Sequence, residues 1–164
     1  MNFGRMLRHL LTPDWRVRAH FPPRTMQAIE TAIAATERTH TGQIRFAVET
    51  TLELGPLLRG VSARERALEI FAQQRVWDTE ANNGVLIYLL LADHDVEIVA
   101  DRGIHAKVGA AEWGRVCHAM EDHFRAGRFE QGVLEGIRVV GAELTRHYPG
   151  AARGNELPDA PVVV

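Results

Sequence analysis

The sequence predicts an α/β fold, a three-layer α/β/α sandwich in which helices cover both faces of a small mixed β-sheet. Residues 85–91 form an almost uninterrupted apolar run of strand length, as expected for a strand buried on both faces. Residues 43–51 alternate apolar and polar side chains with a period of two, which is typical of a second strand. A helical pattern between these strands supplies a crossover connection, so we expect them to be parallel.

The composition is that of one globular domain of ordinary size. The 164 residues suffice to bury a core without disulfides, and a net charge of -2 gives no electrostatic reason to bind nucleic acid. The single cysteine, Cys117, fits a reducing compartment. No apolar run approaches the roughly 18 residues that a membrane-spanning helix needs. We therefore expect a cytoplasmic protein with no transmembrane segment and no nucleic-acid partner.

Residues 1–22 are expected to form an N-terminal amphipathic helix and a linker. We expect this helix to pack on the domain itself or on a second subunit. The alternative is peripheral contact with the inner face of the membrane through residues 3–18, because a cationic amphipathic helix followed by Trp15 suits the headgroup layer. The apolar stripe, opposite Arg5 and Arg8, consists of Phe3, Met6, Leu7, Leu10 and Leu11.

Residues 23–148 are expected to form the main domain, and residues 149–164 a flexible tail. Ser62 and Glu65 form a capping box that opens one of its helices. After the buried strand, a short turn at residues 92–95 leads into a third strand, so these two strands should form an antiparallel hairpin. The other helices are expected at residues 25–40, 110–124 and 130–148.

The predicted hairpin suggests where a site lies. An antiparallel hairpin returns the end of its second strand to the beginning of its first, so Asp101 should lie near Asn82 and Asn83. We interpret this rim of the sheet as the candidate site. The candidate catalytic residues are Asp101, Arg102 and His105, and the candidate binding residues are Trp77, Asn82, Asn83, Gly84 and Gly103.

The same rim carries candidate metal ligands. Asp78, Glu80, Asn82 and Asp101 supply the hard oxygen atoms that suit Ca²⁺ or Mg²⁺, and Arg102 or His105 could contact a phosphate. The alternative is that these residues only shape turns, because Asn and Asp favour turns and Asn-Gly is a common turn dipeptide.

Several pieces of the chain recur together in one known family. They are Ile44-Arg45-Phe46-Ala47-Val48; Trp77 with Asn83-Gly84-Val85-Leu86-Ile87; the segment from Val96 to Arg102-Gly103; and Phe124-Arg125, Gly127-Arg128-Phe129, Gly132 and Gly136-Ile137. On these pieces, residues 25–148 resemble the TPM domain family. The resemblance implies an α/β/α sandwich with a fourth strand, for which residues 51–57 are one place to look.

The resemblance also implies function. Members have been linked to divalent cation binding, weak acid phosphatase activity, and assembly or repair of membrane complexes, and some are encoded beside LemA-type membrane proteins. Two departures stand out in this chain. Many members carry a signal peptide and a transmembrane tail, which we do not find here, and an acidic residue is common at the position of Asn82.

Two hypotheses of function follow. The first is a non-catalytic interaction or ion-binding module that serves a membrane-associated protein partner, of which a LemA-type protein is an example. The alternative is a weak acid phosphatase, in which Asp78, Asn82 and Asp101 hold a divalent cation while Arg102 or His105 engages a phosphomonoester. The only serine, Ser62, is explained by its capping box, and Cys117 lies on an apolar helix stripe as a buried, inert thiol.

Overall fold

Four strands form the central sheet, in the order β3-β2-β1-β4. Strand β1 runs parallel to β2 and β4, whereas β2 and β3 are antiparallel, so the sheet is mixed as predicted. The computed structural model describes residues 3–151 and 154–164; residues 1–2 of the expected N-terminal unit and 152–153 of the expected tail lie outside the described part. The strands are β1 (Gln43–Glu49), β2 (Gly84–Leu90), β3 (Asp95–Ala100) and β4 (Val162–Val163).

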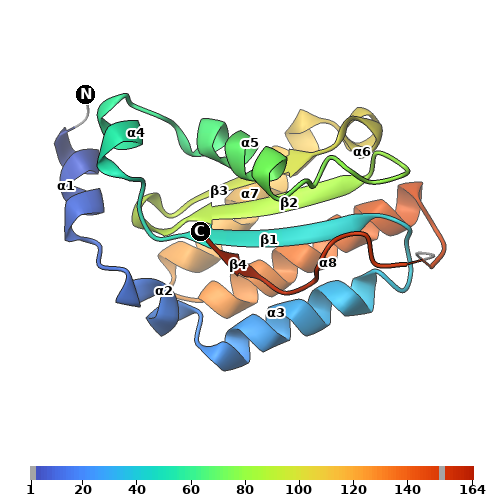
Figure 1. Cartoon of the computed structure of the whole chain (residues 1–164). Helices are drawn as coiled ribbons and strands as arrows, with labels where there is room; N and C mark the ends of the chain where they lie inside the picture. The colour runs from blue at the N-terminus through green and yellow to red at the C-terminus, as the bar shows by residue number, and fades with distance from the viewer. Residues whose placement is uncertain (1–2, 152–153) are drawn as a thin grey trace.

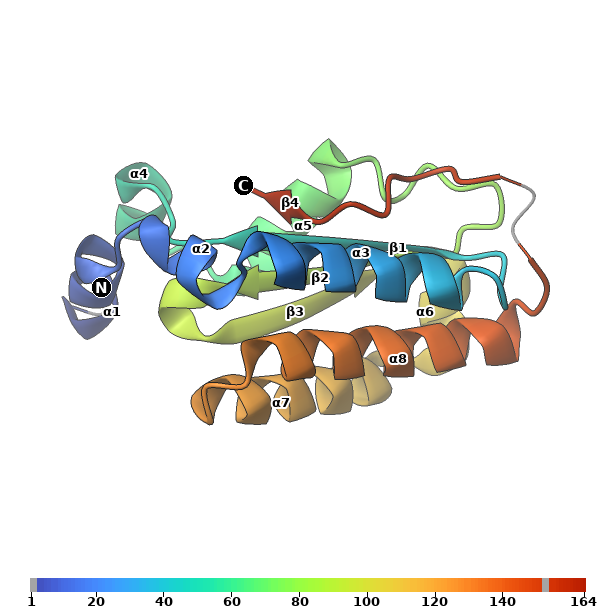
Figure 2. The same ribbon diagram turned by 90° about the horizontal axis from the view of Figure 1, so that it is seen from below.

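Helices cover both faces of the sheet and complete the predicted three layers (Figure 1). Helix α5 (Ala63–Gln73) lies on one face and begins with the predicted capping box of Ser62 and Glu65. The opposite face is covered by three longer helices, which lie close together in Figure 2. They are α3 (Pro23–Thr36), α7 (Ala110–Arg125) and α8 (Phe129–His147).

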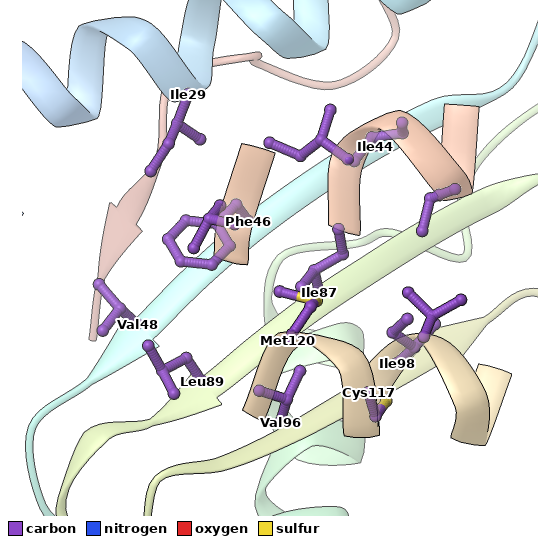
Figure 3. Packing of buried hydrophobic residues seen from close by; sticks show 14 of the residues in the cluster. Ile29, Ile44, Phe46, Val48, Ile87, Leu89, Val96, Ile98, Cys117 and Met120 are labelled. Carbon is purple, nitrogen blue, oxygen red and sulfur yellow. The ribbon is translucent and has the colours of Figure 1, made fainter. Parts of the chain in front are cut away.

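Alternating side chains of the strands build the two halves of the core. On the face of α3, α7 and α8, Ile44 and Phe46 of β1 pack with Ile87 of β2 (Figure 3). On the opposite face, Leu86 and Tyr88 of β2 join the α5 side chains. Every residue of β2 is buried, which confirms the prediction from its uninterrupted apolar run.

The expectation of a flexible tail is wrong for residues 154–164, because polar side chains of β1 hold them. The side-chain carbonyl of Gln43 accepts hydrogen bonds from the backbone N–H groups of Glu156 and Leu157, both at 2.9 Å. The guanidinium of Arg45 donates to the backbone oxygen of Ala160 at 2.8 Å. These bonds satisfy polar groups that the fold buries, and they place the end of the chain beside β1.

The fourth strand is therefore β4, and the expectation that it lies within residues 51–57 is wrong. That region contains a short helix, α4 (Leu54–Leu58). Of four further elements, one was expected as a helix and three were not. The N-terminal unit contains α1 (Phe3–Leu11), as expected, and also α2 (Trp15–His20), while η1 (Leu91–Asp93) forms the hairpin turn and α6 (Arg102–Val108) follows β3. Within the described ranges, no helix combines the length and apolar character needed to cross a bilayer.

The contact between α3 and the C-terminal segment makes stability depend on pH. Glu37 accepts a hydrogen bond from the backbone N–H of Ile44 at 2.8 Å and is only 8% exposed. Burial raises the pKa of Glu37 to about 8; the Ile44 N–H opposes this shift, and Asp159 adds to it. The folded state therefore holds this proton more tightly than the unfolded state, whose carboxyl has a pKa near 4.5. Its contribution to stability is complete below that value and is lost as the pH rises toward 8.

We expect the substitution Glu37→Gln to stabilise the protein at alkaline pH, because the amide carries no charge to bury and retains an acceptor for Ile44. The gain over wild type should be on the order of a few kcal/mol above pH 8 and should vanish below pH 4.5. Urea unfolding at several pH values measures it. Parallel stability curves for the two proteins would contradict the assignment.

Candidate functional site

The hairpin brings the two predicted polar segments together at one rim of the sheet. The backbone N–H of Asp101 donates to the carbonyl of Gly84 at 2.8 Å, and Ile104 N–H donates to the carbonyl of Asn82 at 3.2 Å. The loop after α5 and the start of α6 thus lie side by side (Figure 1). The predicted juxtaposition of Asn83 and Asp101 at one rim is confirmed.

Asn83 is the innermost polar residue of the rim, with no exposed surface. Its backbone N–H donates to the hydroxyl of Thr79 at 3.1 Å, and its side-chain amide donates to the hydroxyl of Thr41 at 3.3 Å. Among the described residues, nothing donates to its side-chain oxygen, Oδ1. A buried acceptor without a donor is costly, so water or a cation is a natural ligand for this oxygen.

Asp101 supplies the second oxygen of this kind. Its Oδ1 accepts from the backbone N–H of Arg102 at 2.7 Å and so caps α6. Its Oδ2 is buried and receives no hydrogen bond from the part of the chain that the structure describes. The Asp101 side chain thus caps α6 through one carboxylate oxygen only.

A hollow of about 380 Å³ opens beside Asp101, between α5 and the start of α6. Trp77, which is half exposed, forms part of its wall together with Arg102 and His105. Arg64 of α5 also lines it, and its guanidinium is held in place by the backbone oxygen of Ile98 at 2.6 Å. Because Glu97 lies 3.4 Å from the same guanidinium, the exposed Arg102 is the main source of positive charge in this hollow.

The other candidate metal ligands do not join Asp101. Asp78 pairs with Arg75 on the surface, and Asn82 is exposed with a left-handed backbone (φ 51°). Glu80 is exposed too, and its backbone N–H donates to Glu156 of the C-terminal segment at 3.0 Å. In residues 3–151 and 154–164 no three His, Cys, Asp or Glu side chains are grouped to hold a metal ion.

The rim therefore fits a divalent cation only in part. Asp101 Oδ2 and Asn83 Oδ1 are hard oxygen donors, as Ca²⁺ and Mg²⁺ require. Mg²⁺ keeps several of its waters and commonly takes one or two protein oxygens, whereas Ca²⁺ takes about six to eight oxygen ligands, so a site with so few protein oxygens would suit Mg²⁺ better.

The two candidate glycines have a steric role. A Cβ at Gly103 would lie 2.5 Å from the carbonyl oxygen of Asn82 and 2.7 Å from the hydroxyl of Tyr148. A Cβ at Gly84 would lie 2.0 Å from the carbonyl oxygen of Val76. Both positions therefore require glycine so that the loop can approach the strands closely.

Arg64 and Tyr148 belong to the rim but were missed from the sequence. The Tyr148 ring lies 5.2 Å from the amino group of Lys107, and burial and the nearby Asp101 raise the pKa of its hydroxyl. Both residues lie far along the chain from the residues they meet, so no local pattern could have revealed them. Helix α6, by contrast, could have been predicted from the sequence, because Asp101 is a favourable N-cap residue and Gly109 a favourable C-cap residue.

Comparison with known proteins identifies the family of this chain. A family model described as the TPM domain matches residues 18–143. The chain belongs to the TPM domain family. A search of curated proteins found no match.

Two solved structures are similar to this TPM domain. The BA42 protein from the psychrophilic bacterium Bizionia argentinensis is 29% identical, with a TM-score of 0.74 over 86% of this chain and 93% of that one. The N-terminal domain of a protein from P. gingivalis is 17% identical, with a TM-score of 0.63 over 84% of this chain and 92% of that one. The second likeness concerns the fold alone.

Proposed function

We propose that this TPM domain is a non-catalytic binding module whose rim hollow receives an acidic group of a membrane-associated protein partner. The observation that carries the proposal is that the exposed Arg102, His105 and the half-exposed Trp77 line one hollow. Guanidinium groups bind carboxylates and phosphates through charge-assisted hydrogen bonds. Exposed aromatic rings and arginines are also the residues that contribute most at protein interfaces. A LemA-type membrane protein is the partner that the family resemblance suggests.

The state of the nucleophiles also supports binding rather than covalent catalysis. Ser62 accepts from the backbone N–H of Glu65 in the capping box, on the outside of α5. Cys117 is buried, and burial raises the pKa of its thiol to about 12, so it stays protonated at neutral pH.

The binding test uses an acidic peptide. We expect a short polyglutamate peptide to shift the NMR signals of the Trp77 indole and the His105 ring, and Arg102→Gln to weaken this binding about tenfold. The matched control is Arg138→Gln, which removes an exposed arginine from α8, where it pairs with Glu135. Equal affinity of the two variants would refute the proposed role of the hollow.

The phosphatase alternative is favoured by one observation, the two unpartnered buried oxygens Asp101 Oδ2 and Asn83 Oδ1. A cation held there would polarise a phosphoryl oxygen, and Arg102 would orient the ester. Hydrolysis of p-nitrophenyl phosphate, measured with and without Mg²⁺ or Ca²⁺, decides between the two functions. On the binding proposal we expect no metal-dependent turnover. Metal-dependent turnover that Asp101→Asn abolishes would instead establish the phosphatase.

A further inference from the structure

Helix α1 is attached to the domain by its polar face. The guanidinium of Arg5 donates to Asp93 at 2.7 Å, and that of Arg8 donates to the same carboxylate at 3.0 Å. His9, only 4% exposed, accepts a hydrogen bond from the backbone N–H of Leu52 through Nδ1 at 3.0 Å. Its Nε2 therefore carries a proton and donates to Asp93 at 3.2 Å. Asp93 and Leu52, which lie on two segments distant from α1 in the sequence, thus determine which way the helix faces.

As a consequence, most of the apolar stripe of α1 faces solvent, and Met6 is the member of the stripe that packs against the core. An amphipathic helix normally buries this stripe against the core, so the arrangement is inverted. Trp15, at the start of α2, continues the same surface, and the groove between the two helices is lined by Leu7, Leu11 and Trp15. The exposed fractions are 69% for Phe3, 46% for Leu7, 63% for Leu10, 70% for Leu11 and 64% for Trp15.

Other exposed apolar residues gather at this end of the molecule. Trp15 lines a second hollow together with Val163 and Val164 from the end of the chain. Helix α4, which exposes Leu54 and Leu58, lies next to α1 (Figure 1). Of the eleven large hydrophobic residues exposed in the described part of the chain, only Leu68 and Trp77 lie elsewhere. Such a concentration of apolar surface marks an interaction site.

The charge around this surface is positive, although the whole chain carries -2. Residues 3–24 contain five arginines and one acidic residue, Asp14. Arg5 and Arg8 pair with Asp93. Arg16 and Arg18 are exposed, and neither forms an ion pair within residues 3–151 and 154–164. A partner that binds this surface must therefore offer an apolar region next to negatively charged groups.

We propose that this surface, formed by Phe3, Leu7, Leu10, Leu11 and Trp15 with Arg16 and Arg18, binds an anionic lipid bilayer. The apolar side chains enter the headgroup and acyl boundary, while the arginines contact lipid phosphates. A second copy of the chain fits less well, because a two-fold interface would bring the arginines of both copies together. A nine-residue helix is marginal in water by itself, but its bonds to Asp93 preform it and reduce the entropy lost on binding.

Vesicle sedimentation with the full chain tests this proposal. We expect recovery with phosphatidylcholine vesicles that contain phosphatidylglycerol, and little recovery with phosphatidylcholine alone. The double substitution Leu7→Asp/Leu11→Asp should reduce the partition coefficient at least tenfold, and Arg16→Glu/Arg18→Glu should do the same on anionic vesicles. Leu68→Asp is the control, since Leu68 is 47% exposed on α5, away from this surface. Leu68 lines the rim hollow, so this variant is expected to alter peptide binding there but to leave vesicle recovery at the wild-type level.

Two results would overturn the proposal. One is recovery of Leu7→Asp/Leu11→Asp equal to that of Leu68→Asp, with both variants shown by circular dichroism to melt as the wild type does. The other is a dimer, detected by light scattering, that Leu7→Asp/Leu11→Asp dissociates while wild type fails to sediment with vesicles. The second result would assign the surface to another copy of the chain. Both leave the rim hollow intact, so they do not bear on peptide binding there.

Discussion

Replacing Gly84 with alanine is expected to destabilise the protein by about 3 kcal/mol or more. A Cβ at this position would lie 2.0 Å from the carbonyl oxygen of Val76 and 3.1 Å from its Cγ1. The backbone atom cannot withdraw easily, because Val76 is fully buried and Gly84 begins the central strand β2. The clash therefore has to be relieved by moving the loop away from the rim, which would also disturb the Asn83 hydrogen bonds.

The matched control is Gly114→Ala, in the middle of α7. No atom lies within 4 Å of a Cβ there, so alanine adds only helix propensity and should stabilise by about 0.5–1 kcal/mol. Urea unfolding of both variants measures the two effects, which have opposite signs. A loss of less than about 1 kcal/mol for Gly84→Ala would mean that the loop shifts freely, contrary to the close packing described above.

Removing Arg66 is expected to cost about 3–5 kcal/mol, because it leaves a buried carboxylate without its counter-ion. Glu49, at the end of β1, is 5% exposed and receives three hydrogen bonds from the Arg66 guanidinium, at 2.9 to 3.2 Å. The hydroxyl of Tyr88 donates to the same carboxylate at 2.6 Å. Methionine in place of Arg66 would keep much of the side-chain volume but none of the donors.

Two further variants separate this charge effect from packing. Glu69→Gln removes the solvent-exposed partner of the same arginine and should change stability by no more than about 0.5 kcal/mol. Adding Glu49→Gln to Arg66→Met removes the unpaired charge while keeping an acceptor for Tyr88, so it should restore at least half of the loss. If the double variant is as unstable as Arg66→Met, lost packing rather than charge burial explains the effect.

Much of the architecture could be predicted from local patterns. The apolar run of β2 indicated burial on both faces, and the hairpin turn placed Asn83 beside Asp101. The capping box of Ser62 was readable because its two partners lie three residues apart. Such patterns depend only on residues close in the sequence, so they can be recognised without knowledge of the tertiary structure.

The candidate site was predicted less completely. Trp77, Arg102 and His105 share the rim hollow, but Asp78 and Glu80 make contacts elsewhere. The sequence pattern of an acidic or amide residue in a loop is the same whether its side chain binds an ion or only stabilises a turn. The contribution of Arg64 depends on the packing of α5 across β3, which no spacing in the loop encodes.

The sequence alone determined the α/β layers, the mixed sheet, the rim and the amphipathic character of α1. Only the tertiary structure decided that α1 turns most of its apolar stripe outward and that the C-terminal segment supplies β4. The physical reason is the same in both cases. Periodicity is a property of residues that are close in the sequence, whereas Arg5 binds Asp93 and Leu157 binds Gln43 across long stretches of chain. These long-range hydrogen bonds decide which side of α1 faces the domain, and they hold a C-terminal segment whose composition alone suggests disorder.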